Sequence, residues 1–88
     1  MPYIKDEIRK FFEESLDQLD LIKLNWSCGD LNYLITQVCQ IYLSKKGEKY
    51  QTYNDIIGVL ECAKMEMYRR KVALYEDKKI QENGDVYE

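Results

Sequence analysis

The chain has 88 residues, of which 45% are hydrophobic and 33% charged, and its formal net charge is −3. This length allows one domain with a small core, so a lone monomer would be only marginally stable. The composition excludes a disordered chain, and no apolar run approaches the roughly 18–20 residues of a membrane-spanning helix. The beginning of the sequence also lacks the features of a signal peptide, so we expect a cytoplasmic protein.

The first periodic segment predicts an amphipathic helix over about residues 6–24. Its apolar side chains recur at steps of three and four residues with acids between them, which is the spacing of one helix face. The sequence NWSCGD then interrupts this pattern with turn-forming residues around one large apolar side chain, Trp26. The apolar positions of this predicted helix are Ile4, Ile8, Phe11, Phe12, Leu19 and Ile22.

A second helix is predicted over about residues 30–46. Ser27 and Asp30 have the spacing of a capping box, although Asp30 alone would also serve as the cap. The apolar residues from Leu31 to Tyr42 form a broad arc, which is expected of a helix covered on more than one side. Gly47 is expected to end the helix in a left-handed conformation.

A third helix is predicted over about residues 53–75, beginning after a second cap-like pair, Thr52 and Asp55. Gly58 lies inside this helix and costs about 0.5–1 kcal/mol relative to alanine, which we expect close approach of another helix to explain. Three helices joined by short turns predict an all-α fold, a small three-helix bundle in a single domain of residues 1–88.

The last segment, residues 76–88, is predicted to be a C-terminal arm. Asn83-Gly84 favours a type I′ hairpin turn, and the alternative is an extended arm in which this pair is a simple bend. An isolated hairpin is marginal in water, so the arm is expected to dock on the bundle or on another subunit. We therefore expect a homo-oligomer, a dimer or a multiple of dimers. The predicted oligomer contacts are Ile80, Val86 and Tyr87.

The sequence predicts no catalytic residue, no metal site and no cofactor, and therefore no enzyme. Without histidine, the commonest general base is missing, and the chain contains no GxSxG, P-loop or GxGxxG motif. Cys28, Cys39 and Cys62 lack the spacing of zinc ligands. The last two fall within apolar helical stripes, so we expect packed free thiols in a reducing compartment.

Basic and aromatic residues are concentrated on the third predicted helix. Tyr68, Lys71 and Tyr75 recur at positions i, i+3 and i+7 of one face, with Arg69 and Arg70 beside them. Tyrosine rings stack on bases, and arginine and lysine bind phosphate, so this pattern predicts a pocket for a small nucleotide-like ligand. The cluster is too narrow for duplex nucleic acid. The same pattern also fits half-buried interface tyrosines with basic side chains near a helix C-terminus.

The stretch GDLNY is a second candidate for ligand contact. Backbone N–H groups at the start of a helix hold anions, and the Asn32 amide both donates and accepts hydrogen bonds. Helix capping alone also explains Asp30 without a ligand. We expect Asn32 and Tyr33 to complete the nucleotide pocket from another helix or subunit.

Four stretches of the sequence, MPYI, GDLNYLIT, IIGVLECAKMEMYRR and YEDKKIQENGDVY, together resemble a family of small uncharacterised proteins common in phages and prophages. The resemblance spans nearly the whole chain and implies a protein that acts in the cytoplasm of a bacterial host. By analogy with other short phage proteins, the expected function is to bind and sequester a small nucleotide-derived signal of host anti-phage immunity. The alternative is a protein–protein interaction module that blocks a host protein.

Overall fold

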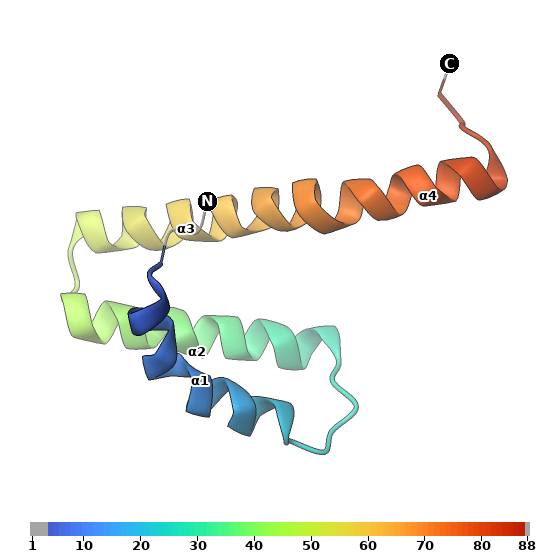
Figure 1. Cartoon of the computed structure of the whole chain (residues 1–88). Helices are drawn as coiled ribbons and strands as arrows, with labels where there is room; N and C mark the ends of the chain where they lie inside the picture. Colours follow the sequence, from blue (N-terminus) through green and yellow to red (C-terminus); the bar gives the residue numbers. More distant parts are fainter. Residues whose placement is uncertain (1–3, 88) are drawn as a thin grey trace. The chain divides into compact units, whose positions relative to one another are not determined.

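The structure of the protein, a computed structural model, describes residues 4–87 (Figure 1). Most of these residues are helical and none of them forms a strand, which confirms the predicted all-α fold. The chain divides into two compact units, one that extends to Asn32 and one that begins at Tyr33.

The first unit contains helix α1, Asp6–Asp20. Asp6 and Glu7 lie in its first turn, where the helix dipole favours negative charge, and Arg9 forms an ion pair with Asp6. The helix ends four residues before the predicted boundary. The N–H of Leu24 is bonded to the carbonyl of Ile22, two residues back, so the backbone already turns there.

Helix α2, Cys28–Lys46, begins with the predicted capping box. The Asp30 N–H donates to the Ser27 hydroxyl at 3.1 Å, and the Ser27 N–H donates to the Asp30 carboxylate at 2.8 Å. This reciprocal pair satisfies two backbone donors that the first turn of a helix otherwise leaves without a partner. The cap of α2 is therefore Ser27 and not Asp30.

The second unit begins as a helical hairpin. Gly47 has a φ of +88°, and its N–H bonds to the Leu43 carbonyl at 2.8 Å, which confirms it as the left-handed terminator of α2. The chain reverses over residues 47–49, and helix α3, Tyr50–Met67, runs back beside α2 (Figure 1). These two helices form the α2–α3 hairpin.

Helix α3 begins three residues earlier than predicted, and the expected cap at Thr52 is wrong. Thr52 lies inside the first turn and is only 3% exposed, so it is packed rather than capping. The Gln51 amide donates to the Asp55 carboxylate at 2.7 Å, a pair of the spacing that stabilises a helix across one turn. Asp55 therefore supports the helix from within instead of marking its start.

Helix α3 continues directly into a π-helix, η1, Tyr68–Val72, and then into α4, Ala73–Asn83. These elements have 18, 5 and 11 residues, so together they form one helical rod of about 51 Å, which we call the long helix.

The expected C-terminal arm is therefore wrong for residues 76–83, which are helical. Asn83-Gly84 ends the long helix instead of turning a hairpin: Gly84 has a φ of +86°, and its N–H bonds to the Ile80 carbonyl at 2.8 Å. Glycine at this position is the commonest helix terminator. Favourable helix formers and the Lys79–Glu82 ion pair, 3.1 Å long, support the last turns, whereas an isolated hairpin is marginal.

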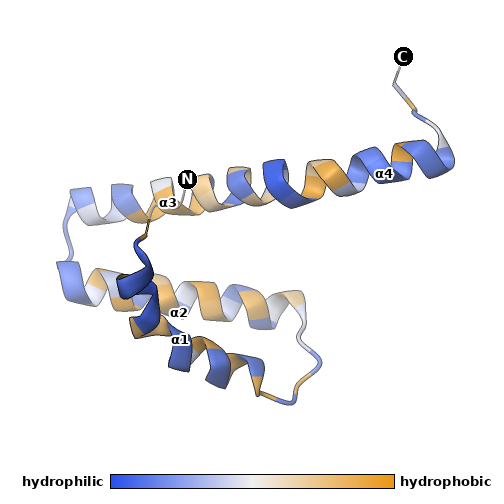
Figure 2. Cartoon of the chain, in the orientation of Figure 1, coloured by the Kyte–Doolittle hydropathy of each residue, from blue (hydrophilic) through white to orange (hydrophobic). Residues whose placement is uncertain are grey.

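Figure 2 shows hydrophobic residues along each of the helices. Among residues 4–87, Thr52 is the one buried side chain, and no apolar side chain is buried. Large side chains such as Phe11, Val38 and Val59 are 78%, 61% and 66% exposed. Each of the two units therefore carries large exposed apolar side chains.

Gly58 has open space around it, so close approach of another helix does not explain it in this structure. No atom lies within 4 Å of the position that a Cβ would occupy. We expect Gly58→Ala to raise the free energy of unfolding by about 0.5–1 kcal/mol, because alanine favours the helix. Gly47→Ala should lower it by about 1–2 kcal/mol, because the φ of Gly47 is positive. Urea unfolding measures both, and a destabilising Gly58→Ala would contradict this account.

Candidate functional site

Four of the predicted ligand-binding residues fall within the π-helix η1. Tyr68, Arg69, Arg70 and Lys71 occupy its first four positions. Turns of π-helix are rare, occur mostly as single insertions in α-helices, and are frequent at functional sites. The local backbone therefore marks the same stretch that the aromatic and basic pattern indicates. We call η1 with these side chains the basic π turn.

One carboxylate gathers both arginines of the basic π turn. Arg69 Nη2 and Arg70 Nη1 donate to the two Glu66 carboxylate oxygens at 3.4 and 3.3 Å. The hydrogen bond from Arg70 is the main cause that lowers the pKa of the Glu66 carboxyl, with burial opposing it and Arg69 adding to it. Glu66 therefore stays ionised at neutral pH. Together with Lys71, these groups carry a net charge of +2.

The two guanidinium groups remain accessible while they are paired. The side chains of Arg69 and Arg70 are 73% and 60% exposed, whereas that of Glu66 is 25% exposed. The side chain of Arg70 is therefore accessible and not buried in a core. Among the ion pairs of residues 4–87, none involves Lys71. The basic π turn thus presents all three cations to solvent.

The π turn changes which side chains share a face of the long helix. The Tyr68 hydroxyl donates to the Glu76 carboxylate at 3.2 Å, eight residues further on. In an unbroken α-helix the residue two turns away is the seventh, so the extra residue of the π turn puts Glu76 where Tyr75 was expected. The charge of Glu76 and this hydrogen bond raise the pKa of Tyr68. Tyr68, Lys71 and Tyr75 were predicted to share one face of the helix, and the π turn interrupts that face.

The two tyrosine rings that were predicted to stack on a base are each more than half exposed. Tyr68 is 52% and Tyr75 61% exposed. The ammonium group of Lys79 lies 5.4 Å from the centroid of the Tyr75 ring, within the range of a cation–π contact. Both tyrosines therefore already have polar partners on their own helix and remain more than half exposed.

The other predicted contact residues lie outside the basic π turn. Asn32 is the last residue of the first unit, and Tyr33, which is 61% exposed, is the first residue of the second. It therefore stays a prediction that these two residues contribute to the same site as the basic π turn. Of the predicted oligomer contacts, Ile80 lies on α4 and is 41% exposed. Val86 and Tyr87, 91% and 85% exposed, lie beyond the end of that helix, and all three assignments stay predictions.

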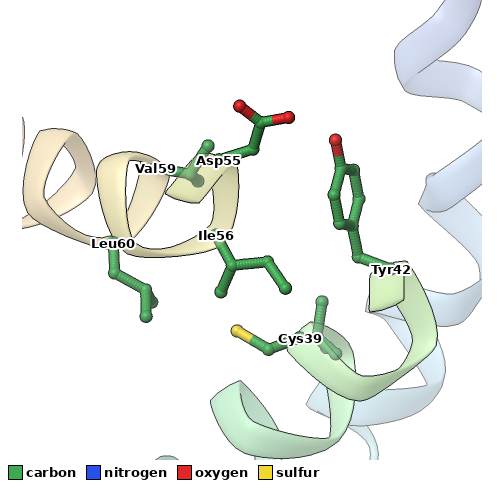
Figure 3. Close-up of a pocket in the computed structure, with 7 residues that line it drawn as sticks. Cys39, Tyr42, Asp55, Ile56, Val59 and Leu60 are labelled. Carbon is green, nitrogen blue, oxygen red and sulfur yellow. The ribbon is translucent and has the colours of Figure 1, made fainter. Parts of the chain in front are cut away.

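The structure also contains a feature that the sequence did not predict, a hollow of about 180 Å³ between the two helices of the α2–α3 hairpin. In Figure 3, Cys39 and Ile56 point toward each other across it, and the Tyr42 hydroxyl and the Asp55 carboxylate lie along one edge. We call this feature the α2–α3 hollow. Its lining residues are Val38, Cys39, Tyr42, Asp55, Ile56, Val59 and Leu60.

The cysteines of the described residues are free thiols in different surroundings. Cys39 is half-buried and lines the α2–α3 hollow, as expected for a packed thiol. Cys62 was predicted to be packed within an apolar stripe, but it is exposed in this chain. No group of histidine, cysteine or acidic side chains in residues 4–87 is arranged to hold a metal ion. None of the helices in that range combines the length and apolar character needed to cross a membrane.

The fold and the site define a small all-α protein with a basic, aromatic π turn on its long helix. Residues 1–86 match the family described as a domain of unknown function, DUF6899, and the chain belongs to this family. No curated protein and no solved structure matches the chain.

Proposed function

We propose that this chain is a non-enzymatic phage protein that binds and sequesters a small nucleotide-derived signal of host anti-phage immunity in the cytoplasm of the bacterial host. The observation that carries the proposal is the basic π turn, where Arg69, Arg70 and Lys71 follow one another beside an exposed tyrosine, Tyr68. The resemblance to small phage proteins supports the phage context.

The chemistry of these side chains favours a phosphorylated, aromatic ligand. A guanidinium group presents a planar fork of donors that matches two phosphate oxygens, and lysine adds a point charge. Arg69 and Arg70 each donate one hydrogen bond to the Glu66 carboxylate, so a phosphate that displaces Glu66 meets two guanidinium groups that already converge on one anion. Tyr68 or Tyr75 then offers a ring on which a base stacks.

The residues around the basic π turn favour a protein that binds its ligand without converting it chemically. The chain contains no histidine, and the acids nearest the basic π turn, Glu66 and Glu76, are engaged by Arg69, Arg70 and Tyr68. An exposed helix face contacts a ligand from one side only, whereas ligand pockets bury most of the ligand surface. We therefore propose that the protein is a homo-oligomer and that another helix or subunit, through Asn32 and Tyr33, closes the site.

Titration calorimetry with defined probes tests this function. The probes are cyclic diadenylate, cyclic triadenylate and cyclic ADP-ribose, with AMP and inorganic phosphate as controls. We expect at least one cyclic probe to bind far more tightly than phosphate and to be recovered intact after the protein is denatured. Affinities no greater than that for phosphate would contradict the proposal, as would a product that increases with protein concentration.

A second candidate function is a protein–protein interaction module that blocks a host protein. It is favoured by the exposed apolar side chains, for example Phe11 at 78% and Ile57 at 67% exposure. A blocker predicts a stoichiometric complex with one host protein that forms without any retained nucleotide. A sequestering protein predicts the reverse, a retained nucleotide without a host protein.

A further inference from the structure

The π turn rotates Lys71 away from Tyr68. The Ala73 N–H donates to the carbonyl of Tyr68, five residues back, which is the hydrogen bond of a π-helix. One turn of the helix takes in an extra residue here, so the third residue after Tyr68 falls short of the face on which Tyr68 lies. On that face the Glu76 carboxylate oxygens lie 3.2 and 3.4 Å from the Tyr68 hydroxyl. A phosphate beside Tyr68 would therefore meet a like charge.

Tyr75 shares its face of the long helix with two lysines. Lys71 precedes it by four residues and Lys79 follows it by four, and residues four apart are neighbours on the surface of a helix. All three residues lie on one continuous helix of the second unit. The ammonium group of Lys79 lies 5.4 Å from the centroid of the Tyr75 ring. We call these three residues the lysine–tyrosine stripe.

Both lysines of the lysine–tyrosine stripe are available to an anionic ligand. Among the ion pairs of residues 4–87, none involves Lys71. Lys79 pairs with Glu82 at 3.1 Å, but a pair within one helix turn contributes little, so a phosphate can replace this carboxylate. Lys79 also covers only one face of the Tyr75 ring, which leaves the other for a base.

The two lysines lie on opposite sides of the ring along the helix. Eight residues of helix separate them, a span of about 12 Å with Tyr75 at its middle. A base stacked on Tyr75 therefore has one ammonium group toward each end of the helix. Arg69 and Arg70 lie at the Lys71 end, so a phosphate bound there meets guanidinium groups as well. The Lys79 end offers a second position for phosphate.

We infer, on the basis of the proposed function, that the ligand contains a nucleotide unit with phosphate on both the 5′ and the 3′ side of its sugar. The base stacks on Tyr75, and Lys71 and Lys79 hold one phosphate each. Cyclic and linear oligonucleotides contain such a unit, whereas AMP and cyclic ADP-ribose do not. Base stacking is thereby assigned to Tyr75 instead of Tyr68, and Lys79 joins the contact residues.

Titration calorimetry of adenosine 3′,5′-bisphosphate and AMP tests this ligand class. The two probes share the base and the 5′-phosphate and differ only in the 3′-phosphate. We expect the parent to bind the bisphosphate about tenfold more tightly or better, because it gains a second charge-assisted contact. Lys79→Ala should remove this preference. Lys78→Ala, the loss of the same charge at the neighbouring position, should keep it.

Replacing the tyrosines one at a time tests which ring stacks on the base. Tyr75→Leu should weaken binding of the bisphosphate about tenfold, and by more than Tyr68→Leu does. Tyr50→Leu removes a tyrosine that is 88% exposed at the start of α3 and should change the affinity by less than about twofold. Circular dichroism verifies that each variant keeps its helices. A larger loss from Tyr68→Leu than from Tyr75→Leu would overturn the assignment.

The outcome separates this ligand class from the proposed function. A parent that binds cyclic diadenylate but does not prefer the bisphosphate to AMP overturns the inferred ligand class and supports sequestration. A preference that survives Lys79→Ala overturns the role of Lys79. A parent that binds neither the bisphosphate nor any cyclic probe overturns both proposals.

Discussion

Replacing Arg69 and Arg70 together by alanine is expected to weaken binding of the tightest cyclic nucleotide probe by two orders of magnitude or more. Each arginine supplies a charge-assisted contact worth about 1.5–3 kcal/mol, so each single replacement should weaken binding about ten- to a hundredfold. Both guanidinium groups are exposed and held by the same carboxylate, so a phosphate reaches them together. Titration calorimetry measures the change.

Lys78→Ala is the matched control for this prediction. It removes one positive charge from the same long helix, two turns beyond the basic π turn. We expect this control to change affinity by no more than a few-fold, since the contribution of a charge at that distance is screened by salt. If the double variant keeps the assembly mass and affinity of the parent, the basic π turn is not the binding site.

Replacing Glu66 by glutamine is expected to strengthen binding of the same probe by about tenfold. The carboxylate of Glu66 holds both arginines in the free protein, and a ligand phosphate has to displace it. Glutamine keeps the shape of the side chain but removes the charge that competes with phosphate, a difference of about one charge-assisted hydrogen bond. Calorimetry of Glu66→Gln against the parent at neutral pH measures the gain.

Glu61→Gln separates this competition from a general change of charge. Glu61 pairs with Lys64 at 3.3 Å on the same helix, and its replacement alters the net charge equally. We expect little gain in affinity from this control. Weaker binding by Glu66→Gln would mean instead that the carboxylate orients the arginines for the ligand, which would contradict the competitive role.

The pH dependence follows from the lowered pKa of Glu66. Above its ordinary value of 4.5 this carboxyl is ionised in both the folded and the unfolded chain, so its pairing with the arginines is fully present at neutral pH. The pairing is lost as the pH falls through the lower folded-state pKa. The affinity difference between the parent and Glu66→Gln should therefore shrink toward zero in that acidic range.

Local signals in the sequence predicted much of the fold. Ser27 and Asp30 have the spacing of a capping box, and both of its hydrogen bonds are present. Gly47 was expected to end a helix with a positive φ and does so. Such motifs are reliable because the backbone groups that they satisfy lie within one turn of the side chain or glycine concerned.

The errors arose where one sequence signal fits two backbone structures. Asn83-Gly84 suits both a hairpin turn and the end of a helix, and the preceding helix formers favoured the second. Thr52 has the spacing of a cap but lies within the first turn of α3. The 3.6-residue periodicity of the sequence carries no sign of the π turn at Tyr68–Val72. The sequence therefore could not predict that Glu76, and not Tyr75, lies next to Tyr68 on the following turns of the helix.

The sequence does contain a signal for the α2–α3 hollow, in the form of uncharged runs on its two helices. The apolar residues from Leu31 to Tyr42 predict a helix covered on more than one side, and the sequence from Tyr33 to Ser44 also contains no charged residue. The run from Ile56 to Leu60 on α3 also lacks charge, and residues of both runs line the hollow. Their coming together depends on the reversal of the chain at Gly47, which has a positive φ.

Native mass spectrometry of the full chain purified from phage-infected bacteria tests the central claim most directly, because it reports subunits and ligand in one spectrum. The account predicts an even-numbered assembly that carries a whole number of ligands of nucleotide mass, released unchanged when the protein is denatured. An assembly from cells with an activated nucleotide-based defence that carries no small molecule would contradict sequestration.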